Sequence, residues 1–337
     1  DDDNILEKTM EHNNINREYI IYVPSSYDKD KKTPLLFNFH GYGGSAMGHL
    51  RNADMRKVCE AQNVILVYPQ GSLDRAGNPH WNSGLKSKDN KSDAEDFDFI
   101  DKLINKISEE YNINEKRIYA CGFSNGGFFS YSLGCYLSEK IAGIGSVGGS
   151  MGIETYNECK PKHPMPMINI HSVRDNVVLY DTEEGTKKIA DVINYWVEFN
   201  KTEKKALKET NVNNTIERYE YKNGENNISV VHYKLLRGGH YWDDNLDYKG
   251  KNTSELICNY LLKYDMDGLI KVERLLKEDE KVKDDSVVCC MAMTKSCLSC
   301  QKGITEDFIF YGDDFCITPV ICMYFYILHN ILYIYIK

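Results

Sequence analysis

The chain has 337 residues, 42% hydrophobic and 12% aromatic, which is ordinary for a folded enzyme and is enough for one large domain with an appendage. Its 50 acidic and 41 basic residues give a net charge of -9. That charge repels a phosphate backbone and argues against a nucleic-acid partner.

Short β-branched and aromatic runs alternate with amphipathic stretches as far as about residue 264. This alternation predicts an α/β fold, with a mostly parallel central sheet flanked by helices. Apolar residues at helical spacing predict helices over 97–111 and 189–196. The Asn-rich segments 82–92 and 211–227 are predicted to be surface loops or insertions, the first where a binding rim could form. The expected strands cover 18–23, 35–40, 64–68, 118–122, 141–147, 167–171 and 230–236.

The composition changes after Asp265. We expect residues 1–268 to form the catalytic domain, 269–288 a charged linker or helix, and 289–337 a Cys-rich and apolar tail of unknown role. The apolar segment 320–336 is at the short limit for a membrane span. A tail anchor, a segment docked on the domain and a non-native extension remain open, and membrane contact is expected only for an anchor. The single C-x-x-C at 297–300 is weak evidence for zinc, and no metal site is expected.

Cysteine and asparagine patterns bear on the compartment. Five cysteines lie up to Cys258, so at least one thiol there is unpaired, and the spacing assigns no bridge. Asn-x-Ser/Thr triplets fit secretion, although they also arise by chance in so Asn-rich a chain. They begin at Asn90, Asn200, Asn213, Asn227 and Asn252.

The strongest chemical signal is the run Gly122-Phe123-Ser124-Asn125-Gly126, between the expected strand 118–122 and a helix that opens at Gly126. A nucleophile on such a strand-to-helix turn has a strained backbone, and only flanking residues without a Cβ leave room for the bend. The geometry predicts Ser124 as the nucleophile and the Asn125 amide as an oxyanion donor beside the helix N-terminus.

A second oxyanion donor is expected in the glycine-rich run that follows the expected strand 35–40. We predict the Tyr42 amide for this role. A glycine-rich turn that only permits positive φ is the alternative. The run is not a phosphate loop, because no Lys-Ser or Lys-Thr follows the glycines.

Serine needs a base at neutral pH, and His240 is the best candidate because it follows the expected strand 230–236. His232 lies inside that strand and is expected to be a packed or surface residue. If His240 is the base, activity should rise as the imidazole loses its proton.

The acid that orients the imidazole is predicted to be Asp175, four residues beyond the expected strand 167–171. Asp181 is the fallback. The chain order Ser124, Asp175, His240 is the order of α/β-hydrolases and differs from both common protease arrangements.

These motifs resemble one family, the secreted esterases grouped as polyhydroxybutyrate depolymerase-like enzymes and feruloyl esterases of carbohydrate esterase family 1. The resemblance covers about residues 15 to 264. It rests on the runs 40–46, 68–71, 81–82, 95–100, 122–127, 171–178 and 238–242.

The resemblance implies a triad of Ser124, Asp175 and His240, no metal or organic cofactor, and an exported enzyme that hydrolyses plant cell-wall esters. Relatives often carry paired cysteines after the Trp-Asn element. This chain has Ser83-Gly84-Leu85 there, which puts that bridge in doubt.

The expected substrate is a feruloyl ester on arabinoxylan, with His40, Gly41, Trp81 and Trp242 as candidate substrate-binding residues. Together with Tyr42, the two tryptophans could sandwich a cinnamoyl ring, or they could be packed in the core. Acetylated xylan and a polyhydroxyalkanoate-type polyester are the alternative substrates. A catalytically inactive carbohydrate-binding protein on the same fold is the alternative of another class.

Overall fold

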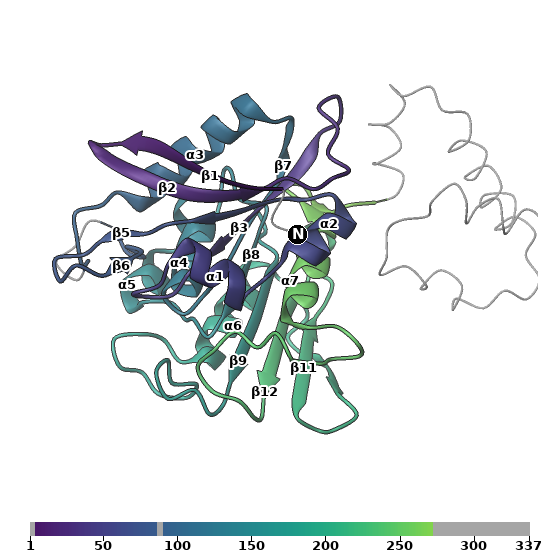
Figure 1. Cartoon of the computed structure of the whole chain (residues 1–337). Coiled ribbons are helices and arrows are strands. Elements are labelled where there is room, and N and C mark those ends of the chain that lie inside the picture. Colours follow the sequence, from purple (N-terminus) through teal and green to yellow (C-terminus); the bar gives the residue numbers. More distant parts are fainter. Residues whose placement is uncertain (1–3, 86–89, 272–337) are drawn as a thin grey trace, which may run out of the picture. The chain divides into compact units, whose positions relative to one another are not determined.

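A computed structural model of the chain describes residues 4–85 and 90–271. Its main sheet has ten strands in the order β1-β2-β4-β3-β7-β8-β9-β12-β11-β10 (Figure 1). Neighbouring strands from β4 to β12 pair in parallel, whereas the pairs at both ends are antiparallel. The strands of this sheet are β1 (Ile5–His12), β2 (Ile15–Tyr22), β3 (Thr33–Phe39), β4 (Ile65–Pro69), β7 (Ile113–Phe123), β8 (Gly143–Val147), β9 (Met167–Ser172), β10 (Leu207–Thr210), β11 (Ile216–Tyr221) and β12 (Val230–Leu235).

Helices cover both faces of the sheet. Successive strand residues point to opposite faces, and the apolar side chains on each face pack against a different set of helices. Leu35, Phe37 and Phe39 of β3 belong to the cluster that also holds apolar residues of α3, α4 and α6, whereas Leu36 belongs to the cluster of α1, α2 and α7. The helices are α1 (Ala46–Asn52), α2 (Arg56–Gln62), α3 (Asp96–Glu110), α4 (Asn125–Tyr136), α5 (Ile153–Glu158), α6 (Ile189–Phe199) and α7 (Thr253–Leu261).

Short elements complete the described part of the chain. They are the strand pairs β5 (Ser72–Leu73) with β6 (Pro79–His80) and β13 (Tyr264–Asp265) with β14 (Gly268–Leu269), and the 3-10 turn η2 (Glu225–Asn227). No described helix combines the length and apolar character that a membrane span requires. The predicted linker from 272 on, the C-x-x-C and the apolar segment 320–336 lie outside the described residues, so the predicted boundary stays a prediction.

The predicted α/β class is confirmed, and each of the seven expected strands has its counterpart in β2, β3, β4, β7, β8, β9 or β12. The helices expected over 97–111 and 189–196 are α3 and α6. The prediction of a loop over 211–227 is wrong, because β11 lies within it. The alternating polar and aromatic residues of β11 pair with β12, and Asn-rich flanks hide that pattern.

Among the described cysteines, Cys135 and Cys159 form a disulfide, and Cys59, Cys121 and Cys258 are free and buried. The prediction of at least one unpaired thiol is therefore confirmed. One expected glycosylation triplet begins at a buried residue, because the Asn200 side chain has no exposure and pairs with the backbone of Met165. The folded chain offers no access for a glycan at that position.

Candidate active site

The predicted site residues gather at one edge of the sheet, where the parallel strands β3, β7, β9 and β12 end. Parallel strands bring their carboxyl ends, and the loops that follow them, to the same edge. Loops after β3, β9 and β12 carry Tyr42, Asp175 and His240, and the turn from β7 into α4 carries Ser124.

Ser124 has the backbone strain expected of a nucleophile turn, with φ 53° and ψ -118°. A non-glycine residue rarely adopts such a conformation, and the surrounding structure must hold it. The Ser124 amide donates to the Val147 carbonyl of β8 at 2.9 Å. A Cβ on Gly122 would overlap the Gly126 carbonyl, and a Cβ on Gly126 would overlap that of Phe39. Both positions therefore require glycine, as the motif predicted.

Ser124, His240 and Asp175 lie in one hydrogen-bonded line. His240 Nε2 lies 2.9 Å from Ser124 Oγ, and its Nδ1 lies 2.8 Å from Asp175 Oδ2. With Asp175 ionised, Nδ1 carries the proton and Nε2 is left as an acceptor for the serine hydroxyl. The fold thus brings together three predicted residues that are 51 to 116 positions apart in the chain.

The Asp175 carboxylate is held from two sides. It is buried, which disfavours its charge, but the hydrogen bond from His240 and the amides of Val177 and Val178 at 2.9 and 2.8 Å outweigh burial. The net result is a pKa of Asp175 below its ordinary value. An ionised acid facing Nδ1 can then stabilise a positive imidazole.

A second histidine contacts the same carboxylate and was not anticipated. His171 Nε2 lies 3.5 Å from Asp175 Oδ2 and 2.7 Å from the Val178 carbonyl, which it contacts as a donor. His171 is buried, and burial lowers its pKa, so the ring stays neutral. It closes the loop that wraps Asp175. Its place inside an expected strand offered no signal of this role.

The line runs from the interior to the surface. The Asp175 side chain is fully buried, that of His240 is 13% exposed, and Ser124 is 9% exposed. The Phe123 ring packs beside the His240 ring, with centroids 4.9 Å apart. An apolar neighbour of this kind limits water around the imidazole and strengthens its hydrogen bonds.

The glycine-rich loop lies against the nucleophile, since a Cβ on Gly41 would lie 3.4 Å from that of Ser124. The amides of Gly43 and Gly44 donate to carbonyls of Pro79 and Gly41. In the part of the chain that the structure describes, the amides of Tyr42 and Asn125 donate no hydrogen bond.

Placement in the core argues against three of the predicted substrate contacts. Trp81, Trp242 and His40 are 2%, 6% and 1% exposed. The Trp81 ring packs against Phe39 and Phe129, so it has no free face for a cinnamoyl ring. These large rings fill space between the elements instead. Tyr42 differs, because it is 44% exposed and lies under Lys91 Nζ at 3.8 Å from the ring centre.

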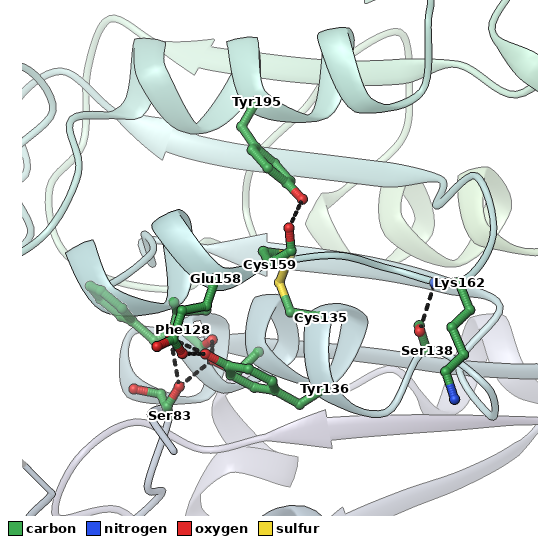
Figure 2. The surroundings of a disulfide bond; sticks show 11 residues. Ser83, Phe128, Cys135, Tyr136, Ser138, Glu158, Cys159, Lys162 and Tyr195 are labelled. Carbon is green, nitrogen blue, oxygen red and sulfur yellow. Dashed lines mark hydrogen bonds between the residues drawn. A yellow bond between two sulfur atoms is a disulfide. The ribbon is translucent and has the colours of Figure 1, made fainter. Parts of the chain in front are cut away.

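A disulfide ties α4, the helix that follows Ser124, to the segment after α5. Cys135, near the end of α4, is bonded to Cys159, just after α5 (Figure 2). In the same region the Ser83 carbonyl accepts hydrogen bonds from the hydroxyls of Ser132 and Thr155. These hydroxyls hold the segment that follows Asn82, where the resemblance had put a disulfide in doubt.

Comparison with known proteins gives a family match over residues 23–216, to the family described as Phospholipase/Carboxylesterase. Feruloyl esterase B of Piromyces equi is 33% identical over 167 residues, 49% of this chain and 30% of that protein. A bifunctional acetylxylan esterase/xylanase of Neocallimastix patriciarum is 26% identical over 229 residues, 66% of this chain and 31% of that protein. The chain thus spans about a third of the length of these two relatives.

Solved structures agree on the fold. An acetyl xylan esterase from Aspergillus awamori aligns with a TM-score of 0.57 at 11% identity, over 76% of this chain and 98% of that one. A feruloyl esterase module from Clostridium thermocellum aligns with a TM-score of 0.53 at 11% identity, over 77% and 87%. At these identities the structures establish the fold alone. Because the family match covers more than half of its length, the chain belongs to the phospholipase/carboxylesterase family and has the α/β-hydrolase fold.

Proposed function

We propose that the chain is a serine esterase in which Ser124 is the nucleophile, His240 the general base and Asp175 the acid that orients it. The Ser124 oxygen bonds to the ester carbonyl carbon while His240 Nε2 takes the hydroxyl proton. The oxyanion accepts hydrogen bonds from the amides of Asn125 and Tyr42. His240 then protonates the leaving alcohol as its bond to the carbonyl carbon breaks. Water repeats the cycle on the acyl-enzyme and restores the Ser124 hydroxyl.

One observation carries the proposal: His240 lies within hydrogen-bonding distance of both Ser124 and Asp175, at 2.9 and 2.8 Å. A nucleophile, a base and an orienting acid in this order are what acyl transfer requires. The strained backbone of Ser124 supports the same proposal, because residues held in such conformations cluster at functional sites.

The substrates we propose are esters of plant cell-wall polysaccharides, with feruloyl groups on arabinoxylan as the first choice. This follows the relatives of the chain, several of which are named feruloyl esterase. We also propose that the protein is secreted. The Cys135–Cys159 disulfide supports an oxidising compartment, since such bonds are rare where thiols are kept reduced.

Acetyl esters on xylan are the second candidate, and a specific observation favours them. With Trp81 and Trp242 in the core, Tyr42 is the one aromatic of the three that is exposed to flank a cinnamoyl ring. A small acyl group needs no such ring. A relative named for acetylxylan esterase activity matches the larger share of the chain, 66%.

The test of catalysis is turnover of p-nitrophenyl acetate by the wild type and by Ser124→Ala. We expect the variant to lose about 10⁶-fold in kcat, because without the nucleophile the triad contributes nothing. Unchanged folding by circular dichroism is the control. Equal rates in the two proteins would contradict the proposal, and an inactive wild type would favour the carbohydrate-binding alternative.

Rates on methyl ferulate and on acetylated xylan decide the acyl group. A kcat/KM on methyl ferulate at least about tenfold above that on acetylated xylan supports the feruloyl assignment, since selective contacts with the acyl group are worth that much. The reverse ratio supports the acetyl assignment.

A further inference from the structure

The short segment Pro79–Asn82 contacts both sides of the proposed oxyanion hole. The Asn125 side chain pairs with the Trp81 backbone at two points: Oδ1 accepts the Trp81 amide at 2.8 Å and Nδ2 donates to its carbonyl at 3.0 Å. Only a carboxamide offers an acceptor and a donor in this arrangement. The residue whose amide faces the oxyanion is therefore clamped through its own side chain.

The same segment holds the glycine-rich loop. The indole Nε1 of Trp81 donates to the His40 carbonyl at 3.0 Å, and the Gly43 amide donates to the Pro79 carbonyl at 2.8 Å. These two bonds flank Tyr42, whose amide is the second proposed donor. One segment of chain thus connects the two backbone amides that must converge on a single oxygen.

The segment is itself anchored in the interior. The Asn82 amide donates to Asp96 Oδ2 at 2.8 Å, and Asp96 Oδ1 accepts from Arg17 at 2.8 Å. The side chains of Arg17 and Asp96 are 1% and 0% exposed, and the guanidinium stacks on the Phe99 ring at 3.8 Å. A buried, hydrogen-bonded pair of this kind resists displacement, because moving either partner leaves an unpaired charge.

From these contacts we infer that Trp81 and Asn125 are positioning residues, which set the spacing of the Tyr42 and Asn125 amides through the segment Pro79–Asn82. Hydrogen-bond donors stabilise an oxyanion only when they are already aimed at it, and a loosened donor loses most of its effect on the transition state while ground-state binding is retained. This inference rests on the proposed esterase function and gives the buried Trp81 a role other than substrate contact.

The test uses Asn125→Ala, with Asn200→Ala as a matched control. Asn200 makes the same two-point pairing with a backbone, that of Met165, at 2.7 and 2.8 Å, in a region outside the site. Both variants lose the same interactions and comparable stability, but only Asn125→Ala releases the segment. We expect its kcat on p-nitrophenyl acetate to fall about tenfold to a hundredfold at nearly constant KM, with kcat of Asn200→Ala within about twofold of wild type.

Trp81→Phe keeps the aromatic packing and removes the hydrogen bond to the His40 carbonyl. It therefore tests the positioning role of the segment Pro79–Asn82 if Asn125→Ala does not fold. We expect a smaller fall in kcat, about threefold to tenfold, again at constant KM. In the double variant, the fold loss in kcat should be smaller than the product of the two single losses, because both substitutions disturb the same spacing between the amides of Tyr42 and Asn125.

A readout that needs no turnover separates this inference from the proposed function. The rate at which a fluorophosphonate labels Ser124 should fall in Asn125→Ala and Trp81→Phe but not in Asn200→Ala. If the wild type is labelled but cleaves no ester, the esterase proposal fails while the positioning role is still measured. Equal labelling of all four proteins, or equal losses in Asn125→Ala and Asn200→Ala, would overturn the positioning role.

Discussion

His240 and His40 both lie in loops at the same edge of the sheet, and they show what separates the proposed general base from a structural histidine. The ring nitrogens of His240 contact side chains, Asp175 and Ser124, and the ring is partly exposed. Those of His40 contact backbone groups of Gly41 and Gly71 at 2.7 and 2.8 Å, and the ring is buried.

The difference is electrostatic as well as geometric. Burial lowers the pKa of His40 to about 4, so it stays neutral and serves as a fixed donor and acceptor. His240 faces a carboxylate that can balance a positive charge on its ring, as the proposed role of general base requires. Changes to the partners of the His240 ring should therefore alter the rate, and changes to the His40 ring itself should alter the stability of the fold.

Asp175→Asn is the variant that tests whether the partners of the His240 ring control the rate. Asparagine carries no charge, and its NH2 group can donate to Nδ1, so the imidazole loses both its tautomer and its counter-charge, and we expect kcat to fall about 10⁴-fold. Asp181→Asn, an exposed acid of the same loop region, is the control and should leave kcat unchanged within about twofold. Kinetics and thermal unfolding of both variants check this. A larger loss in Asp181→Asn would move the acid to the fallback residue.

Gly126→Ala tests whether the close packing of the turn between β7 and α4 is needed for the stability of the fold. The added methyl would overlap the Phe39 carbonyl, so either β3 or α4 must shift, and we expect a loss of about 3 kcal/mol in the free energy of unfolding. Gly152 has a negative φ of -60° and open space around its Cβ position. Gly152→Ala should therefore stay within about 0.5 kcal/mol of wild type in urea unfolding. Equal stabilities would show that the nucleophile turn tolerates a side chain.

The sequence was most informative where a residue's role depends on its position at the end of a strand. Ser124, Asp175 and His240 each follow an apolar run, and the order of parallel strands then brings them to one edge. Glycine was equally informative at 122 and 126, since steric overlap leaves no other residue for those positions.

Side-chain surroundings were the part that the sequence did not reveal. A tryptophan near an active site is the same residue whether it lies in a cleft or in the core, and Trp81 lies in the core. Its pairing with Asn125 joins positions 44 apart, and the Arg17–Asp96 pair joins positions 79 apart. No local pattern encodes such contacts. Helices α1, α2 and α5, of 6 or 7 residues, were missed because they are too short for a helical period to stand out.

The smallest predicted effect isolates the neutral state of His40. Between pH 6.5 and about 4, a histidine in the unfolded chain binds a proton, whereas buried His40 in the folded protein does not. The contribution of His40 to the free energy of unfolding therefore falls as the pH falls. Asp244, whose pKa burial raises to about 6, acts in the opposite direction, so the wild type alone cannot show this slope. The difference between wild type and His40→Gln removes Asp244 from the comparison.

We expect the wild-type advantage in the free energy of unfolding to shrink by on the order of 1 kcal/mol between pH 6.5 and 5.5, since one proton is worth about 1.4 kcal/mol per pH unit. Urea unfolding at both pH values measures it. Asn200→Ala loses a buried pairing without a titrating group, and its difference from wild type should be constant over this range. A constant difference for His40→Gln as well would mean that His40 takes a proton in the folded protein, and that its neutrality is not what separates it from His240.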